Sequence, residues 1–316
     1  MILDRQKKLL HRKSQVFFIY LFLIILMLVS GIMNHVFFTA RNFTNLITTA
    51  LPYILVSFAQ TLVILTGGID LSVGAVVCVS NVICATLMKN DAMSFWMGLI
   101  LALLSGIAIG AINGVIITKG RIQPIIVTLA MQTIFLGVAL TILPSPGGSV
   151  DIAFASFVSG KILGIPVPLL IEIVLSIALW LLLNRTRFGT SVFAVGGNED
   201  AAYSFGIMVT GRKISVYAIA GFLSALAGVF LTAQMYSGDP TVGTNFTMNS
   251  IATAVVGGTA LSGGKGGIIG SIAGVFILII INNFLNLVNV SSFYQYVLQG
   301  AILILALTIS SLRTRR

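Results

Sequence analysis

The chain has 316 residues, of which 57% are hydrophobic and only 8% are charged, and its mean hydropathy is +1.07. A soluble domain carries about 25% charged residues, so this composition excludes a soluble globular protein and indicates a polytopic membrane protein. The formal net charge of +10 would suggest nucleic-acid binding in a soluble chain. Here the basic residues flank apolar segments, where they set membrane topology, and we expect no nucleic-acid partner.

Apolar segments begin close to the N-terminus. The first 13 residues are polar and basic, and the apolar run after them lacks a small-residue cleavage site, which predicts a retained first span. The two cysteines, Cys78 and Cys84, share one apolar segment and indicate no disulfide framework. Nine segments have spanning length: 16–36, 44–66, 71–88, 95–118, 124–143, 167–184, 214–234, 268–288 and 293–312.

The basic residues indicate a tenth crossing. Positive charge in the tail 1–15, around Lys119, in the loop 185–213 and at the C-terminus favours the cytoplasmic side for all four. Three clear spans separate the last two, and an odd number cannot return the chain to the same side. We therefore expect a glycine-broken eighth crossing in 247–263, either full or partly re-entrant. Three basic residues then remain outside: Arg41, Lys89 and Lys161.

The expected fold is accordingly all-α. It is a single transmembrane domain over 1–316 with about ten helices, both termini in the cytoplasm, and broken helices near 65–74 and 255–266. A pair of glycines marks each break: Gly67 and Gly68 mark the first, and Gly257 and Gly258 mark the second. Paired broken helices point toward a transport path.

One acidic residue, Asp70 in "LTGGIDLSVGAV", lies amid apolar sequence. Gly68 can take the left-handed turn that ends a helix. Asp70 is then placed to cap the next helix by accepting from amides near Ser72 and Val73. Two interpretations stay open: a helix cap, which we favour, and a residue of the permeation path or its inner gate.

Other polar residues within the spans have two possible roles. They line a path for a polar solute, or they join helices by hydrogen bonds, which is the favoured interpretation for most of them. The candidates for the path or gate are Asp70, Ser72, Asn113, Gln132, Asn282 and Asn286, and further buried polar positions are Gln60, Asn81, Asn283 and Gln299.

The sequence contains no pattern typical of an enzyme. It shows no zinc-ligand cluster, nucleophile–base pair or paired carboxylates, so we expect no catalytic residue, metal or cofactor. The run "SGGKGG" around Lys265 is not a phosphate-binding loop, because Gly266 follows the lysine where that motif needs Ser or Thr. If the chain moves a solute across the membrane, we therefore expect it to take its energy from a partner.

The loop 185–213 is the one long cytoplasmic loop. Asn198 is a good N-cap, and Glu199 and Asp200 in the following turn suit the helix dipole. Gly206 ends the predicted helix after about two turns, too short to be stable alone. The spacing favours equally an ordinary loop helix and a helix that docks on a partner.

Three ordered motifs, "GGIDLSVGAV", "FGTSVFAVGGNEDAAYSFGI" and "VVGGTALSGGKGGIIGSIAGV", resemble the ribose-type permeases of bacterial ABC importers. These belong to the branched-chain amino acid/monosaccharide permease superfamily, and the resemblance covers nearly the whole chain. It implies a multi-pass protein of the bacterial cytoplasmic (inner) membrane. The implied partners are a second permease, identical or related, two cytoplasmic ATP-binding subunits, and a periplasmic or lipid-anchored sugar-binding protein.

The resemblance also implies that the helix in 185–213 is the coupling helix, seated in a groove of the ATPase. The residues carried over are Asn198, Glu199, Asp200, Ala201, Ala202 and Gly206. We expect the two alanines to form the small-residue surface that fits the groove.

The leading hypothesis is the membrane subunit of an ATP-driven importer for a monosaccharide, ribose or a similar sugar, working by alternating access. The alternative is a stand-alone secondary carrier or facilitator for a small polar solute. A non-transporting scaffold gives no reason for the broken helices.

Overall fold

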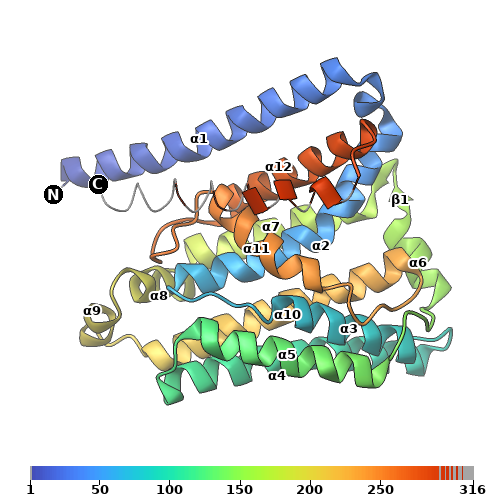
Figure 1. Ribbon diagram of the computed structural model, residues 1–316. Coiled ribbons are helices and arrows are strands. Elements are labelled where there is room, and N and C mark those ends of the chain that lie inside the picture. Colours follow the sequence, from blue (N-terminus) through green and yellow to red (C-terminus); the bar gives the residue numbers. More distant parts are fainter. Residues whose placement is uncertain are drawn as a thin grey trace.

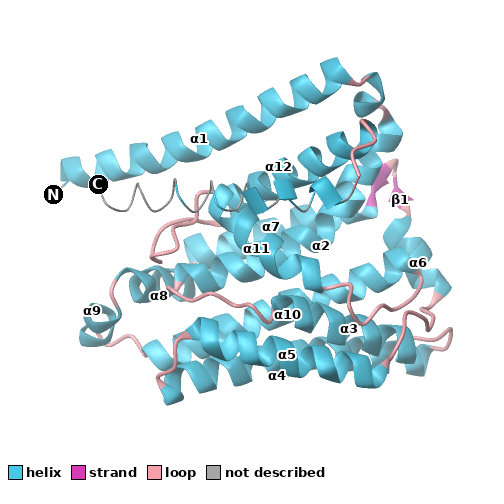
Figure 2. Cartoon of the chain, viewed as in Figure 1, coloured by secondary structure: helices cyan, strands magenta, loops and turns pink. Residues whose placement is uncertain are grey.

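The structure is a computed structural model that describes the backbone of residues 2–291, 293–295, 297–298, 300–301, 304 and 308, with side chains from residue 16 onward. Long helices lie side by side in one bundle, and the described strands form a single short hairpin (Figures 1 and 2). The elements are α1 (Ile2–Met33), the 3-10 helix η1 (His35–Phe38), α2 (Ala40–Leu65), α3 (Val73–Leu87), α4 (Ala92–Gly120), α5 (Pro124–Ile142), α6 (Ile152–Ser159), β1 (Lys161–Ile162), β2 (Ile165–Pro166), α7 (Val167–Arg185), α8 (Arg187–Gly197), α9 (Glu199–Ser204), α10 (Val209–Met235), α11 (Thr244–Val256) and α12 (Ile268–Leu287).

The all-α membrane class is confirmed. Seven described helices are long and apolar enough to cross a membrane: α1, α2, α4, α5, α7, α10 and α12. Each matches a predicted span at its core. The predicted span 71–88 is the 15-residue α3, and the interval 247–263 contains most of the 13-residue α11. Span 293–312 and Gln299 lie mostly or wholly outside the described residues, so the count of ten remains a prediction.

The two ends of the bundle carry different elements. The N-terminus of α1 lies at the same end as α8 and α9, while β1 and α6 lie at the opposite end (Figure 1). The end that carries α9 is therefore cytoplasmic by the charge argument. Helix α6, the β1–β2 hairpin and α8 were not predicted from the sequence. They are short elements in the connections that flank α7.

Helix α10 lies at the centre, against α2, α3 and α4. Its contact with α4 is backbone to backbone. A Cβ added to Gly106 would lie 2.4 Å from the carbonyl oxygen of Gly221, and one on Gly110 would lie 2.1 Å from that of Tyr217. The four-residue glycine spacing on α4 thus serves close helix packing.

The break between α2 and α3 is held from several sides. The left-handed turn is at Gly67, with φ +79°, and not at Gly68 as predicted. Asp70, three residues after Gly67, is only 2% exposed. Asp70 Oδ1 accepts from the Ser72 amide at 2.8 Å and from the Ser72 hydroxyl at 2.6 Å. The Ser72 hydroxyl oxygen in turn accepts from Asn113 Nδ2 of α4 at 2.8 Å.

Asp70 therefore holds the break through Ser72 alone. The prediction that it caps α3 is wrong, because the N-cap of α3 is Ser72 and its side chain makes no capping bond. The expected bond to the Val73 amide is absent from the described contacts of this segment. The backbone of Leu71 is tied to two more helices: its amide donates to Thr128 of α5 at 3.0 Å, and its carbonyl accepts from Thr247 of α11 at 3.3 Å. The broken segment is thus anchored to α4, α5 and α11.

Substitution of Asp70 tests its hold on Ser72. Asp70→Asn keeps an oxygen acceptor and is expected to be mild. Asp70→Leu leaves two buried Ser72 donors without an acceptor, each costing about 1–3 kcal/mol. The yield of folded protein and its thermal midpoint in detergent should therefore fall.

Asp239→Leu is the matched control, because Asp239 makes the same pair of bonds to the Thr241 amide and hydroxyl, at 2.8 and 2.7 Å, in an exposed turn. It should change yield little. Normal yield for Asp70→Leu, together with a changed solute preference, would place Asp70 on the permeation path instead.

Candidate functional site

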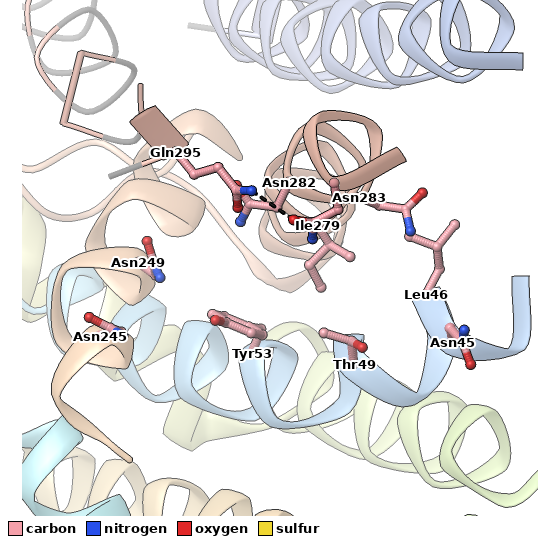
Figure 3. Close-up of a pocket in the computed structure, with 11 residues that line it drawn as sticks. Asn45, Leu46, Thr49, Tyr53, Asn245, Asn249, Ile279, Asn282, Asn283 and Gln295 are labelled. Atoms are coloured by element: carbon pink, nitrogen blue, oxygen red, sulfur yellow. Dashed lines mark hydrogen bonds between the residues drawn. The ribbon is translucent and has the colours of Figure 1, made fainter. Parts of the chain in front are cut away.

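A polar pocket of about 290 Å³ lies between α2, α11 and α12 (Figure 3). We call it the carboxamide pocket, because six asparagines and one glutamine line it and no charged residue does. Its lining residues are Asn45, Leu46, Thr49, Tyr53, Asn245, Asn249, Ile279, Asn282, Asn283, Asn286 and Gln295.

Helical spacing brings these side chains together. Asn45, Thr49 and Tyr53 follow each other at four-residue steps on α2. Such residues share one helix face. The same step separates Asn245 from Asn249 on α11 and Asn282 from Asn286 on α12. All three helices place these residues toward the end opposite α9, so the pocket lies in the outer half of the bundle.

Several lining side chains are already oriented by hydrogen bonds. Asn283 and Asn42 exchange two bonds, at 3.1 and 2.8 Å. Gln295 Nε2 donates to Asn286 Oδ1 at 2.7 Å, a bond drawn in Figure 3. The ring of Tyr53 stacks on Phe246 with centroids 4.3 Å apart, which fixes the aromatic wall of the pocket.

Beneath the pocket the same three helices are joined by buried hydroxyl pairs. Thr253 donates to the Ser57 hydroxyl at 3.0 Å, and the hydroxyls of Thr61 and Ser271 are 2.6 Å apart. All four residues are at most 1% exposed. The pocket is therefore closed on its cytoplasmic side in this conformation.

The predicted path and gate residues form two separate groups in the structure, and one of them belongs to neither group. Asn282 and Asn286 line the pocket together, whereas Asp70, Ser72 and Asn113 form the buried cluster at the α2–α3 break. Gln132 is half-buried on α5 and joins neither group. The predicted helix breaks are present, with Gly67 and Gly68 after α2, and Gly257 and Gly258 after α11.

Sequence reasoning missed the contribution of α2 and α11 to the pocket. Their signal was the four-residue repeat of polar side chains, Asn45 to Tyr53 and Asn245 to Asn249. Of the other polar candidates, Asn81 donates to Thr232 at 2.8 Å and Asn283 pairs with Asn42. These two join helices, in agreement with the favoured interpretation.

The cytoplasmic helix α9 forms where the sequence predicts it. Asn198 Oδ1 accepts from the Ala201 amide at 2.9 Å, Glu199 pairs with Lys213 of α10, and Gly206 has φ +83° after the helix ends. Asp200 lies in the first turn.

The prediction that Ala201 and Ala202 form an exposed small-residue surface on α9 is wrong for Ala202. Ala201 is exposed, but Ala202 is only 3% exposed, because that face of α9 packs on its own chain. The side chains presented to the cytoplasm are large: Tyr203, Phe205 and Met208 are 75%, 85% and 82% exposed. Large exposed apolar residues that lie close together are typical of surfaces that contact another protein or a membrane.

Comparison with known proteins identifies the family. The profile described as "Branched-chain amino acid transport system / permease component" matches residues 42–307. The chain is 42% identical to the ribose import permease protein RbsC of Bacillus subtilis (strain 168) over 290 residues, which are 91% of this chain and 90% of the relative. It is 37% identical to RbsC of Escherichia coli (strain K12) over 296 residues, 92% and 91% of the two chains.

The D-allose transport system permease protein AlsC of the same organism is 34% identical over 296 residues, 93% of this chain and 90% of the relative. No solved structure gives a significant match. These relatives are named as transport permeases, not enzymes. The chain therefore belongs to the branched-chain amino acid transport system / permease component family, as a ribose-type ABC permease of the bacterial inner membrane.

Proposed function

We propose that this chain is the membrane-spanning subunit of an ATP-driven importer that carries ribose or a similar monosaccharide into the cell. The observation that carries the substrate class is the carboxamide pocket. Each sugar hydroxyl both donates and accepts hydrogen bonds, and carboxamide side chains supply both kinds of partner. The absence of charge among the lining residues suits a neutral solute.

The size of the pocket supports a single sugar ring. Small-molecule sites usually have volumes of about 300–1,000 Å³, and this one, at about 290 Å³, is at the lower end. The names of the curated relatives, ribose, D-allose and L-arabinose permeases, agree with a monosaccharide.

In the proposed mechanism the sugar enters the outer half of the bundle from an extracytoplasmic binding protein. Asn249 of α11 and Asn282 of α12 hold it transiently, opposite Tyr53 of α2. The hydroxyl pairs beneath the pocket then separate as the three helices shift, and the sugar passes to the cytoplasm. A partner ATPase drives the shift, and a second permease, identical or related, completes the membrane unit.

The ATPase is proposed to dock on α9 through Tyr203, Phe205 and Met208. The ion pair between Glu199 and Lys213 fixes α9 on the start of α10, so a push on α9 reaches the bundle. The exposed aromatic pair replaces the two alanines as the expected contact, because Ala202 already packs on its own chain.

Replacing a pocket asparagine tests the substrate site. Asn282→Leu keeps the side-chain volume and removes the polar groups. A hydrogen bond contributes about 0.5–1.5 kcal/mol, so sugar uptake in vesicles should fall roughly two- to tenfold per lost bond. Stimulation of ATP hydrolysis by the loaded binding protein should persist.

Asn184→Leu is the control, because Asn184 donates to the Trp180 carbonyl of its own helix and lies outside the pocket. Its uptake should match that of the parent. If Asn282→Leu shows the uptake kinetics and sugar preference of the parent, the pocket is not part of the transport route.

Replacing the most exposed aromatic residue near α9 tests the docking surface. The few residues that dominate an interface cost about 2 kcal/mol or more when truncated, and they are often aromatic. If Phe205 is one of them, Phe205→Ala should reduce co-purification of the ATPase subunit roughly thirtyfold at limiting concentration. Membrane insertion should be normal, because Phe205 is 85% exposed.

Leu163→Ala is the matched control: Leu163 is 97% exposed but lies in the β1–β2 turn at the opposite end of the bundle. It should leave ATPase binding unchanged. If a Phe205→Ala, Tyr203→Ala double variant still binds the ATPase fully, the proposal that α9 is the docking surface is contradicted.

A further inference from the structure

Three segments far apart in the sequence meet beside α9. They are the last residue of α2, the last turn of α8 and the loop that follows α11. The Gly264 amide donates to the Leu65 carbonyl at 3.0 Å. Gly196 lies against the same two groups: a Cβ added to it would be 1.7 Å from the Leu65 oxygen and 2.7 Å from the Gly264 nitrogen.

We call this meeting of Leu65, Gly196 and Gly264 the glycine contact. Gly263 reinforces it, since a Cβ there would lie 2.6 Å from the Gly196 carbonyl oxygen. At these separations the contact is between backbones, with no side chain interposed. A displacement of one segment therefore cannot be absorbed by a change of rotamer and moves its neighbours directly.

On one side the glycine contact is continuous with α9. Gly196 belongs to the last turn of α8, and Asn198, two residues later, is at once the C-cap of α8 and the N-cap of α9. The Asn198 amide donates to the Ala194 carbonyl at 3.1 Å, and its own carbonyl accepts from the Ala202 amide at 3.0 Å. No flexible linker separates the two helices.

The position of α8 is also fixed against α10. The Arg212 guanidinium lies 4.7 Å from the ring centroid of Phe188, while the Glu199–Lys213 pair holds α9. Both anchors lie at the start of α10. Helices α8 and α9 are thus both held to the start of α10 and to each other.

On the other side the glycine contact reaches the carboxamide pocket. Helix α2 has 26 residues, a length of about 39 Å at 1.5 Å per residue. It ends at the contact and carries Asn45 and Thr49 of the pocket at its far end. Helix α11 carries Asn249 and ends just before the loop that contains Gly264. The two helices are also joined midway by the Ser57–Thr253 bond.

We propose that the glycine contact passes the movement of α9 to the end of α2 and to the loop after α11, and that Gly196 is the positioning residue that makes this transfer tight. The inference rests on the proposed function, in which a partner ATPase moves α9. A side chain at position 196 would push α8 away from both broken helices. It would weaken the link between ATP hydrolysis and sugar movement without touching sugar or ATPase.

Two neighbouring substitutions separate coupling from packing. Gly196→Ala places a methyl group in the contact, whereas Gly197→Ala meets nothing within 4 Å. Both lie in the last turn of α8 and change helix propensity alike. Each variant is assembled with the ATPase subunit and the binding protein in proteoliposomes, and sugar uptake per ATP hydrolysed is measured, together with folded yield and ATPase co-purification.

We expect Gly196→Ala to assemble and hydrolyse ATP, with uptake per ATP reduced at least about fivefold, the lower bound of typical coupling between sites. Gly197→Ala should match the parent. Parental coupling in Gly196→Ala, or equal loss in both variants, overturns the proposal. Absence of ATP-driven uptake in the parent complex would instead contradict the proposed function.

If Gly196→Ala does not assemble, a spin-label experiment tests whether the glycine contact moves as one body. Spin labels at Gly197→Cys and Ser262→Cys, with Cys78 and Cys84 replaced, report the distance between the end of α8 and the loop after α11. The distance should stay constant through the ATP cycle, because the contact moves as one body. A distance that changes on ATP binding overturns the proposal.

Discussion

The structure depends on how the ends of broken helices are satisfied inside a membrane protein. In a bilayer no water is available for free backbone groups, so irregular backbone must find partners within the protein. Here the two breaks supply partners for each other and for their neighbours: Leu65 accepts from Gly264, and Leu71 bonds to Thr128 and Thr247. Asp70 completes the set by accepting from Ser72. The breaks therefore form one structural unit.

This unit lies between the two surfaces on which the proposed function depends. Toward the outside, α2, α11 and α12 carry the uncharged carboxamide pocket, closed beneath by the hydroxyl pairs of Ser57, Thr61, Thr253 and Ser271. Toward the cytoplasm, the end of α2 and the loop after α11 touch α8, which is continuous with α9.

Features encoded locally were predictable from the sequence. The long apolar runs give the long helices, and Asn198 followed by two acidic residues gives the start of α9. The role of Asp70 was only partly predictable: it binds Ser72, two residues later, but α3 begins without a side-chain cap. The pocket was only half predictable, because Asn45, Asn249 and Asn282 come from three helices whose packing no local pattern specifies. The burial of Ala202 was missed for the same reason: the orientation of a short helix is set by the surface on which it packs.

The central claim is that this chain moves sugar only when a partner ATPase drives it. Its most direct test is uptake of radiolabelled ribose into proteoliposomes that contain the purified permease, alone or with its ATPase and sugar-binding subunits. We predict uptake that requires all three components and ATP hydrolysis, with none by the permease alone. Ribose flux through the permease alone, down its gradient and without ATP, would contradict the account and identify a stand-alone carrier.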